Sequence, residues 1–397
     1  MLSKRIWVCL AALVLLAASA GNTTAQIQQL TAQEQLGKQL FFDQNLSEPV
    51  GQACAACHAP GVGFTGDNDS INTHGAVYEG AVPGRFGNRK PPAAAYAGAS
   101  PILALAKGIW TGGMFWDGRA TGWRLGDPLA EQAQGPFLNP LEQNLPNASE
   151  VVARVSMSSY STLFNTVCGA ATTIQDKYDC IGRAIAAYER SPDVTSFTSK
   201  FDLGKLSKQE QNGLNLFRGK AKCDRCHVSK GKKPMFTDYT YDNLGIPRNP
   251  ENPFYNELAY NPMGAAWVDE GLGGFLKNDP TYFNVARTEI GKEKVPTLRN
   301  VAKGSCEADY SPCVTKAYGH NGYFKNLKDI VHFYNTRDVL PVCGGQKNKP
   351  GVDCWPLPEI GLNINTKEVG NLGLTSAEEA DIVAFLKALS DSHTAIP

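Results

Sequence analysis

The stretches Cys54-Ala-Ala-Cys57-His58 and Cys223-Asp-Arg-Cys226-His227 are two copies of one pattern, Cys-x-x-Cys-His. This pattern is typical of c-type haem attachment, because two thiols add to the porphyrin vinyl groups and the adjacent imidazole binds the iron. Two chance matches are rare in a chain of 397 residues with 11 cysteines and 6 histidines. We therefore expect two covalently attached haems, held by Cys54, Cys57 and His58 and by Cys223, Cys226 and His227, with both histidines bound to iron.

Two other kinds of site also use closely spaced cysteines. A structural zinc site would need the two cysteine pairs to converge on one metal ion. A thioredoxin-like redox pair has no use for an adjacent histidine. Both alternatives explain less of the pattern than haem attachment does.

The N-terminus has the features of an export signal. Lys4 and Arg5 form a short basic start, the apolar run 6–18 follows, and the small residues 18–20 suit a signal peptidase. An uncleaved membrane anchor is the alternative, but the apolar run is shorter than the roughly 20 residues that span a bilayer. We expect residues 1–25 to be a signal peptide and the mature protein to be periplasmic, with no stable membrane span.

The overall composition is that of a globular protein with a mixed surface. Hydrophobic residues make up 42% of the chain and charged residues 19%, which gives no sign of disorder. Removal of Lys4 and Arg5 with the signal leaves 36 basic against 38 acidic residues, a net charge of −2. Nucleic acid is therefore not an expected partner.

The remaining cysteines suit an oxidising compartment. Cys9 lies within the signal, so six cysteines are left beside the four in the haem motifs. Six cysteines allow 15 connectivities, and free buried thiols are a further alternative. Because the six fall into three close pairs, the simplest prediction is three local disulfides, 168/180, 306/313 and 343/354.

Each haem motif follows the same upstream pattern. Thr31-x-x-Glu34-x-x-Gly37-x-x-Leu40-Phe41 precedes the first motif, and Ser207-x-x-Glu210-x-x-Gly213-x-x-Leu216-Phe217 precedes the second. Ser/Thr-x-x-Glu is a capping box, so each motif follows a short capped helix that presents Leu and Phe towards the porphyrin. The repeat indicates duplication of a cytochrome c-like unit.

The rest of the chain predicts a mainly α fold with long loops and little β structure. The stretches 61–98 and 230–295 contain many turn residues and no strong period. Apolar residues recur at helical spacing in four segments, 149–168, 176–190, 326–334 and the last helix, which opens at Thr375. We expect two cytochrome c-like haem domains, residues 26–195 with the N-terminal haem and residues 196–397 with the C-terminal haem.

Several further motifs occur in a fixed order along the chain. With the two haem motifs, they resemble the bacterial di-haem cytochrome c peroxidase and MauG family over residues 30–390. The resemblance implies peroxide chemistry at the N-terminal haem and electron transfer or charge sharing at the C-terminal haem. The motifs are Leu40-Phe41-Phe42-Asp43, Phe115-Trp116-Asp117-Gly118-Arg119, Glu131-Gln132-Ala133-x-Gly135-Pro136, Asn139-Pro140-x-Glu142, Val295-Pro296-Thr297-Leu298-Arg299-Asn300 and Gly319-His320-Asn321-Gly322.

The resemblance implies a peroxide pocket above the first haem. Glu142 and Gln132 match the distal acid and amide, and Pro136 matches a proline of the pocket wall. A carboxylate there can move a proton between the two peroxide oxygens. Trp116 matches the tryptophan that carries charge between the haems. Without the resemblance, the simpler interpretation would be a tryptophan packed in the core. Six extra residues between Trp116 and Gln132, relative to the usual spacing, predict a different pocket entrance.

Tyr334 decides the subfamily that the chain resembles. It matches the position of the second haem's distal ligand, where peroxidases of this type have a methionine and MauG has a tyrosine. A tyrosine oxygen favours ferric or higher oxidation states. The alternative for Tyr334 is a buried core residue on the apolar face of the 326–334 helix. His332 would point elsewhere on that helix, so we do not choose it.

Two features of the family are less well matched. His74 lies near the place of a displaceable distal histidine, but its neighbours differ, and an ordinary loop histidine is the simpler interpretation. The resemblance also implies calcium between the domains. Lys90 and Lys294 stand at or near the ligand positions, and a lysine offers no acceptor to a hard cation, which argues against calcium.

We weigh three functions on this basis. The first is an exported di-haem oxidoreductase that uses hydrogen peroxide to form high-valent haem iron and oxidises a protein partner at aromatic residues, as MauG does. The second is a peroxide-scavenging cytochrome c peroxidase fed by a small cytochrome or cupredoxin. The third is a non-enzymatic electron carrier, which would not need an acid and an amide above an open iron.

Overall fold

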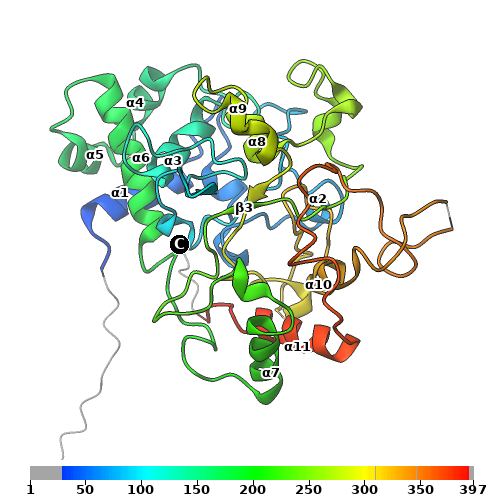
Figure 1. The fold of residues 1–397 in the computed structure, drawn as a ribbon. Coiled ribbons are helices and arrows are strands. Elements are labelled where there is room, and N and C mark those ends of the chain that lie inside the picture. Colours follow the sequence, from blue (N-terminus) through cyan, green and yellow to red (C-terminus); the bar gives the residue numbers. More distant parts are fainter. Residues whose placement is uncertain (1–28, 309, 346, 393–397) are drawn as a thin grey trace, which may run out of the picture.

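The computed structural model describes residues 29–308, 310–345 and 347–392, so the predicted signal peptide lies outside the described residues. The fold is mainly α, as predicted (Figure 1). The α-helices are α1 Ala32–Phe42, α2 Asp69–Thr73, α3 Pro128–Leu138, α4 Ala148–Ser156, α5 Ser161–Cys168, α6 Ile174–Arg190, α7 Lys208–Arg218, α8 Gly271–Leu276, α9 Phe283–Ala286, α10 Leu327–Thr336 and α11 Ser376–Lys387.

Among the described residues, the β structure consists of two small antiparallel pairs and some isolated bridges. β1 Ala104–Ala106 pairs with β2 Ile109–Thr111, and β3 Tyr241–Asp242 pairs with β4 Glu293–Lys294. The second pair joins two distant parts of the loop-rich stretch 230–295. Little β structure was expected there, and the prediction is confirmed.

Capping boxes begin the helices that the sequence predicted them to begin. Thr31, Ser207 and Thr375 each accept a hydrogen bond from the backbone of the glutamate three residues later, whose side chain accepts one in return. These bonds satisfy backbone N–H groups that a helix start would otherwise leave unpaired. α1, α7 and α11 therefore begin where local sequence chemistry favours a helix.

The repeated glycine of the two upstream helices allows a close helix crossing. A Cβ atom at Gly37 would collide with the Ala184 carbonyl of α6, and one at Gly213 would collide with the Asp381 carbonyl of α11. α1 therefore packs on α6 in the way that α7 packs on α11. The duplication read from the sequence extends to these two helix pairs.

The two largest hydrophobic cores of the described residues follow one another along the chain, and a smaller core joins side chains from 103–110 to side chains from 241–286. Of the two largest cores, one contains buried side chains between Leu36 and Val194, and the other contains buried side chains between Leu214 and Leu389. In Figure 1, α1 and α3–α6 gather in one part of the molecule and α7, α10 and α11 in another. The domain boundary at 195/196 stays a prediction.

Other helices differ in detail from the sequence-based prediction. The segment 149–168 forms two helices, α4 and α5, that are separated by a turn. α6 begins at Ile174 because Thr173 caps it. α3 was not predicted, although Asp127 as N-cap and Pro128 in the first turn form a recognised start signal.

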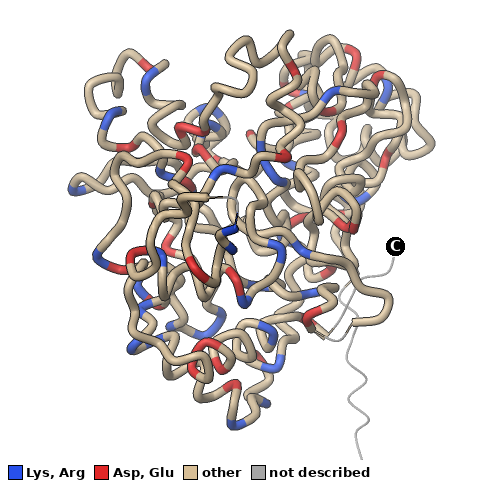
Figure 2. The backbone as a smooth tube through the Cα atoms, turned by 90° about the vertical axis from the view of Figure 1, so that its right-hand side faces the viewer, with Lys and Arg blue, Asp and Glu red and all other residues tan. Residues whose placement is uncertain are grey.

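The six remaining cysteines pair locally, as the spacing predicted. Cα–Cα distances are 5.9 Å for Cys168–Cys180, 4.8 Å for Cys306–Cys313 and 5.0 Å for Cys343–Cys354. Within the described ranges, none of the helices combines the length and apolar character needed to cross a bilayer. Figure 2 shows basic and acidic residues interspersed along the backbone, which agrees with the balanced net charge.

Candidate functional site

Each Cys-x-x-Cys-His motif opens onto its own cavity. The first cavity, of about 170 Å³, is lined by Cys54, Cys57 and His58. The second cavity, of about 210 Å³, is lined by Cys223, Cys226 and His227. These four cysteines are free and half-buried, whereas the other six described cysteines form disulfides. Two thiols and an imidazole therefore meet at each cavity, which is the donor set that a covalently attached haem requires.

Both motif histidines are held in the orientation that an iron ligand needs. Nδ1 of His58 lies 3.2 Å from the Phe64 carbonyl oxygen, and Nδ1 of His227 lies 2.9 Å from that of Phe236. A carbonyl can only accept, so Nδ1 carries the proton and Nε2 is left with its lone pair for a metal. Burial lowers the pKa of His58 to about 4 and also lowers that of His227, which keeps both rings neutral.

The two carbonyls come from phenylalanines in an uncommon backbone conformation. Phe64 has φ 59° and Phe236 has φ 54°, in the left-handed region that few residues other than glycine adopt. This conformation turns each carbonyl towards the imidazole. Sequence reasoning missed this pair, although the dipeptide Phe-Thr follows both motifs, as Phe64-Thr65 and Phe236-Thr237.

The upstream helices contribute one of their two predicted residues to the cavities. Phe41 of α1 lines the first cavity and Phe217 of α7 lines the second. Leu40 is buried in the core, and Leu216 packs against the second core. The prediction that Leu and Phe both face the porphyrin is therefore wrong for the leucines, because a helix turns adjacent residues to different sides.

The first cavity brings together the residues implied by the resemblance. Gln132 and Pro136 line it from α3, and Glu142 lines it from the turn after α3. The Asn139 amide donates a hydrogen bond of 2.8 Å to Glu142 Oε1. Burial raises the pKa of Glu142, while the nearby Arg119 opposes the shift. A carboxylate with a raised pKa that lines the same cavity as His58 and Gln132 is suited to exchange protons there.

One face of α10 forms part of the wall of the second cavity. Tyr334 lines this cavity together with Leu327, Ile330 and Val331. This face was predicted to be buried, but Ile330 and Tyr334 are half-buried, because they border the cavity instead of a solid core. Desolvation raises the pKa of Tyr334. The second cavity therefore contains an imidazole, His227, and a phenol, Tyr334.

His332 and His74 both lie apart from the cavities. Nδ1 of His332 lies 2.9 Å from a Glu379 carboxylate oxygen, which supports the choice of Tyr334 over His332 on this helix. His74 is exposed at the end of α2, with its Nδ1 2.8 Å from the Ser70 carbonyl oxygen. It lines neither cavity, so ligation of the first haem by His74 has no support in this structure.

Trp116 lies between the two cavities and lines both. Its side chain is 8% exposed, and its indole Nε1 donates a hydrogen bond of 2.9 Å to the Lys90 carbonyl oxygen. Lys90 also lines both cavities. The ring is therefore fixed at the boundary between the two cavities.

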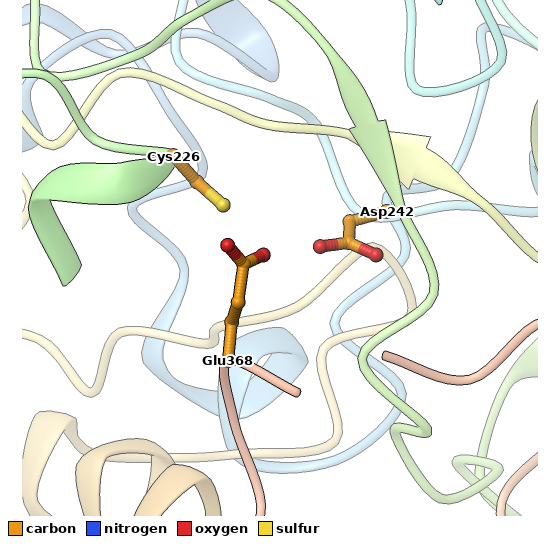
Figure 3. A group of neighbouring side chains, drawn as sticks. All are labelled: Cys226, Asp242 and Glu368. Carbon is orange, nitrogen blue, oxygen red and sulfur yellow. The ribbon is translucent and has the colours of Figure 1, made fainter. Parts of the chain in front are cut away.

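Two acids stand beside the second haem attachment. Asp242 of β3 and Glu368 point towards the Cys226 thiol (Figure 3). The Asn365 amide donates hydrogen bonds to both carboxylates, at 2.6 Å to Asp242 and 2.8 Å to Glu368. Burial raises the pKa of Asp242. Cys226 belongs to the haem-attachment motif and is therefore not available as a metal ligand. We interpret the two acids as negative charges that act on the second haem and not as a separate metal site.

Sequence reasoning also missed a buried ion network next to Trp116. Arg89 bonds to Asp117 at 2.6 Å and to both carboxylate oxygens of Asp269 at 2.5 Å. The Arg89 guanidinium holds the pKa values of both acids low, against the effect of burial. Charged residues in long loops gave no sequence signal for this pairing, which connects positions 180 residues apart.

Comparisons with known proteins agree with this geometry. A family model described as di-haem cytochrome c peroxidase matches residues 31–211. The chain is 32% identical over 405 residues to the methylamine utilization protein MauG of Paracoccus denitrificans, covering 96% of this chain and 95% of that protein. It is 28% identical to the cytochrome-c peroxidase IdrP1 of Denitromonas iodatirespirans, covering 89% of this chain and 80% of that protein.

A solved structure gives the same result for the fold. The di-haem peroxidase BthA of Burkholderia thailandensis superposes with a TM-score of 0.73 at 29% identity. The superposition covers 92% of this chain and 87% of that one. The arrangement of the two cavities therefore belongs to a fold already seen with two haems.

Proposed function

Since the chain belongs to the family of MauG and di-haem cytochrome c peroxidases, we propose that this two-haem oxidoreductase uses hydrogen peroxide to oxidise a protein partner at aromatic side chains. The observation that carries the finer part of the proposal is Tyr334, a tyrosine in the second cavity with His227. The predicted export signal places the reaction in the periplasm.

Each bound haem supplies a redox-active iron that exchanges electrons with peroxide or with another redox centre. His58 and His227 would hold the two irons through Nε2, because their Nδ1 atoms are hydrogen-bonded to backbone carbonyls. The four free cysteines fix the porphyrins covalently. The protein thereby sets the position of both cofactors before any substrate arrives.

Glu142 and Gln132 handle the peroxide. The Glu142 carboxylate takes a proton from one peroxide oxygen and returns it to the other, which leaves as water. The hydrogen bond from Asn139 holds Oε1, and no other hydrogen bond to the Glu142 carboxylate is formed within the described residues. The Gln132 amide lines the same cavity and can orient the peroxide by hydrogen bonding.

Trp116 and Tyr334 distribute the oxidising equivalents. Trp116 lines both cavities and can pass single electrons between them. Tyr334 would offer its phenol oxygen to the second iron, and an oxygen ligand stabilises oxidised iron more than a thioether does. A protein that keeps both oxidising equivalents in this way suits a slow reaction with a large partner better than fast turnover with a small donor.

Peroxide titration tests this function. One equivalent of hydrogen peroxide is added to the diferric protein, and the oxidising equivalents still held after a delay are titrated with a one-electron reductant. We expect two equivalents to persist in the wild type and to decay faster in Tyr334→Met. Immediate loss in the wild type contradicts the proposal.

Peroxide scavenging is the second candidate, because Glu142 and Gln132 would serve it equally well. Steady-state turnover separates the two functions. Rapid peroxide reduction with a small cytochrome or cupredoxin as donor favours scavenging, and slow turnover with these donors favours oxidation of a larger protein partner.

A further inference from the structure

Three lysines line the second cavity without an acidic partner. They are Lys90, Lys294 and Lys316. Among the residues that the structure describes, none of the three has a carboxylate within ion-pair distance. An ammonium group removed from water without a paired counter-charge is costly, so the three lysines require a reason. Five carboxylates line the same cavity, but none of them is paired with these lysines.

Hydrogen bonds hold the Lys90 ammonium in a fixed position. Its Nζ donates to Thr65 Oγ1 at 3.2 Å and to the Pro91 carbonyl oxygen at 3.0 Å. Its backbone N–H donates to the His320 carbonyl oxygen at 2.9 Å, which connects it to the C-terminal half. Lys90 therefore has polar contacts on several sides and borders both cavities.

The other two lysines are bound in the same manner, by neutral oxygens. Nζ of Lys294 donates to the Gly112 carbonyl oxygen at 2.9 Å, and Nζ of Lys316 donates to the Val62 carbonyl oxygen at 2.8 Å. Desolvation lowers the pKa values of all three lysines, to about 8 for Lys90 and about 7 for Lys294. Negative charge in the cavities would reverse this effect.

Haem brings that negative charge, since each porphyrin has two propionate carboxylates. Two bound haems would therefore bring four acidic groups to the two cavities. Calcium, by contrast, does not fit at the position of the Lys90 ammonium. A hard cation needs several oxygen ligands, and the oxygens next to Lys90 Nζ already accept hydrogen bonds from an ammonium. At Lys90, the family's interdomain calcium and the donor set therefore disagree. Asp269, Glu293 and His320 also line this cavity and lie close enough to share a metal ion, but both Asp269 oxygens already accept hydrogen bonds from Arg89.

We propose that the Lys90 ammonium is a built-in cation between the two haem cavities and takes the place of a bound calcium ion. Its charge balances haem carboxylates and favours the reduced form of both irons. Its backbone carbonyl, which accepts the Trp116 Nε1 hydrogen bond, makes Lys90 also a positioning residue for the ring between the cavities. The proposal requires two bound haems but does not depend on which substrate the enzyme oxidises.

The first test uses the holoprotein. Metal content is measured after purification, and the thermal midpoint and both haem reduction potentials are recorded with EGTA and with added calcium. We expect no stoichiometric calcium and no change in the midpoint or the potentials. Stoichiometric calcium whose removal by EGTA lowers the midpoint or shifts a potential would overturn the proposal, whatever the substrate proves to be.

The second test removes the charge. We expect Lys90→Met to shift the ferric–ferrous equilibrium of both haems about tenfold towards ferric, which is about 59 mV for a one-electron couple. Lys90→Arg keeps the charge and should stay near the wild type, and Lys205→Met is the control for loss of an exposed lysine. Unchanged potentials in Lys90→Met refute the charge role. If that variant does not fold, the EGTA measurement and Lys90→Arg decide.

Discussion

The indole Nε1 of Trp116 donates a hydrogen bond of 2.9 Å to the carbonyl oxygen of Lys90, and both residues line the two cavities. The contact fixes an oxidisable ring at the boundary between two Cys-x-x-Cys-His sites. A tryptophan in this position can exchange electrons with either side without moving. Under the proposed function, the two haems would therefore act as one oxidising unit.

Replacement of Trp116 by phenylalanine should uncouple the two sites. Phenylalanine keeps an aromatic ring but is harder to oxidise and loses the hydrogen bond, at a cost of about 1 kcal/mol in stability. We expect the first haem to react with peroxide at an unchanged rate and the second to be oxidised more slowly. Stopped-flow absorbance at the two haems measures both steps, and simultaneous oxidation of the two haems in Trp116→Phe would disprove the relay.

Replacement of Glu142 by glutamine should slow the reaction with peroxide. The amide keeps the shape but cannot accept the proton, and general acid–base catalysis contributes about 10²- to 10⁴-fold. We expect a loss of this size in the bimolecular rate constant. Glu131→Gln is the matched control, since Glu131 bonds to the backbone of the 122–125 turn and does not line the cavity. An equal loss in both variants would argue for a structural effect.

The pH dependence of the same reaction follows from the raised pKa of Glu142. Its carboxylate must be ionised to accept a proton, so the rate falls as the pH drops through its pKa. Because burial raises that pKa above the ordinary 4.5, we expect the acid limb above pH 4.5. The limb should vanish in Glu142→Gln. A wild-type rate that stays flat down to pH 4.5 would contradict this assignment.

The acids beside Cys226 should tune the second haem. Asp242→Asn removes a negative charge near the attachment site but leaves an amide that can still bond with Asn365. Less negative field disfavours ferric iron, so we expect the potential of the second haem to rise and that of the first to stay constant. Spectroelectrochemistry measures both. A lower reduction potential of the second haem in Asp242→Asn would contradict this explanation.

The glycine of the helix crossing should be intolerant of a methyl group. Gly213→Ala places a Cβ against the Asp381 carbonyl of α11, and overpacking costs about 1 to 3 kcal/mol. Chemical denaturation of the holoprotein measures the free energy of unfolding. Gly361→Ala is the control, because nothing lies within 4 Å of its added Cβ. Equal stability of the two variants would show that the helix pair adjusts without cost.

Local sequence signals predicted the parts of this fold that depend on local chemistry. The capping boxes at Thr31, Ser207 and Thr375 correctly gave three helix starts, and close spacing correctly gave the three disulfides. The repeat indicated the duplication, and the structure adds the reason for its glycines. These features need only a few neighbouring residues, so a single sequence can reveal them.

Long-range relationships were not visible in the sequence. The ion pairs of Arg89 join residues far apart in loops, and no period or motif marks them. The left-handed carbonyls of Phe64 and Phe236 depend on backbone geometry that phenylalanine does not favour. The placement of Glu142, Gln132 and Tyr334 beside the cavities came from the family resemblance, because periodicity alone would have left them in a loop or a core.

The central claim is that the phenol oxygen of Tyr334 is the distal ligand of the second haem. The spectra of the diferric protein test this claim most directly. Electron paramagnetic resonance of the wild type should show one high-spin and one low-spin haem. In Tyr334→Phe, which removes only the phenol oxygen, the low-spin signal should become high-spin, whereas the control Tyr323→Phe, outside both cavities, should leave it unchanged. An identical low-spin signal in Tyr334→Phe and the wild type would contradict the account.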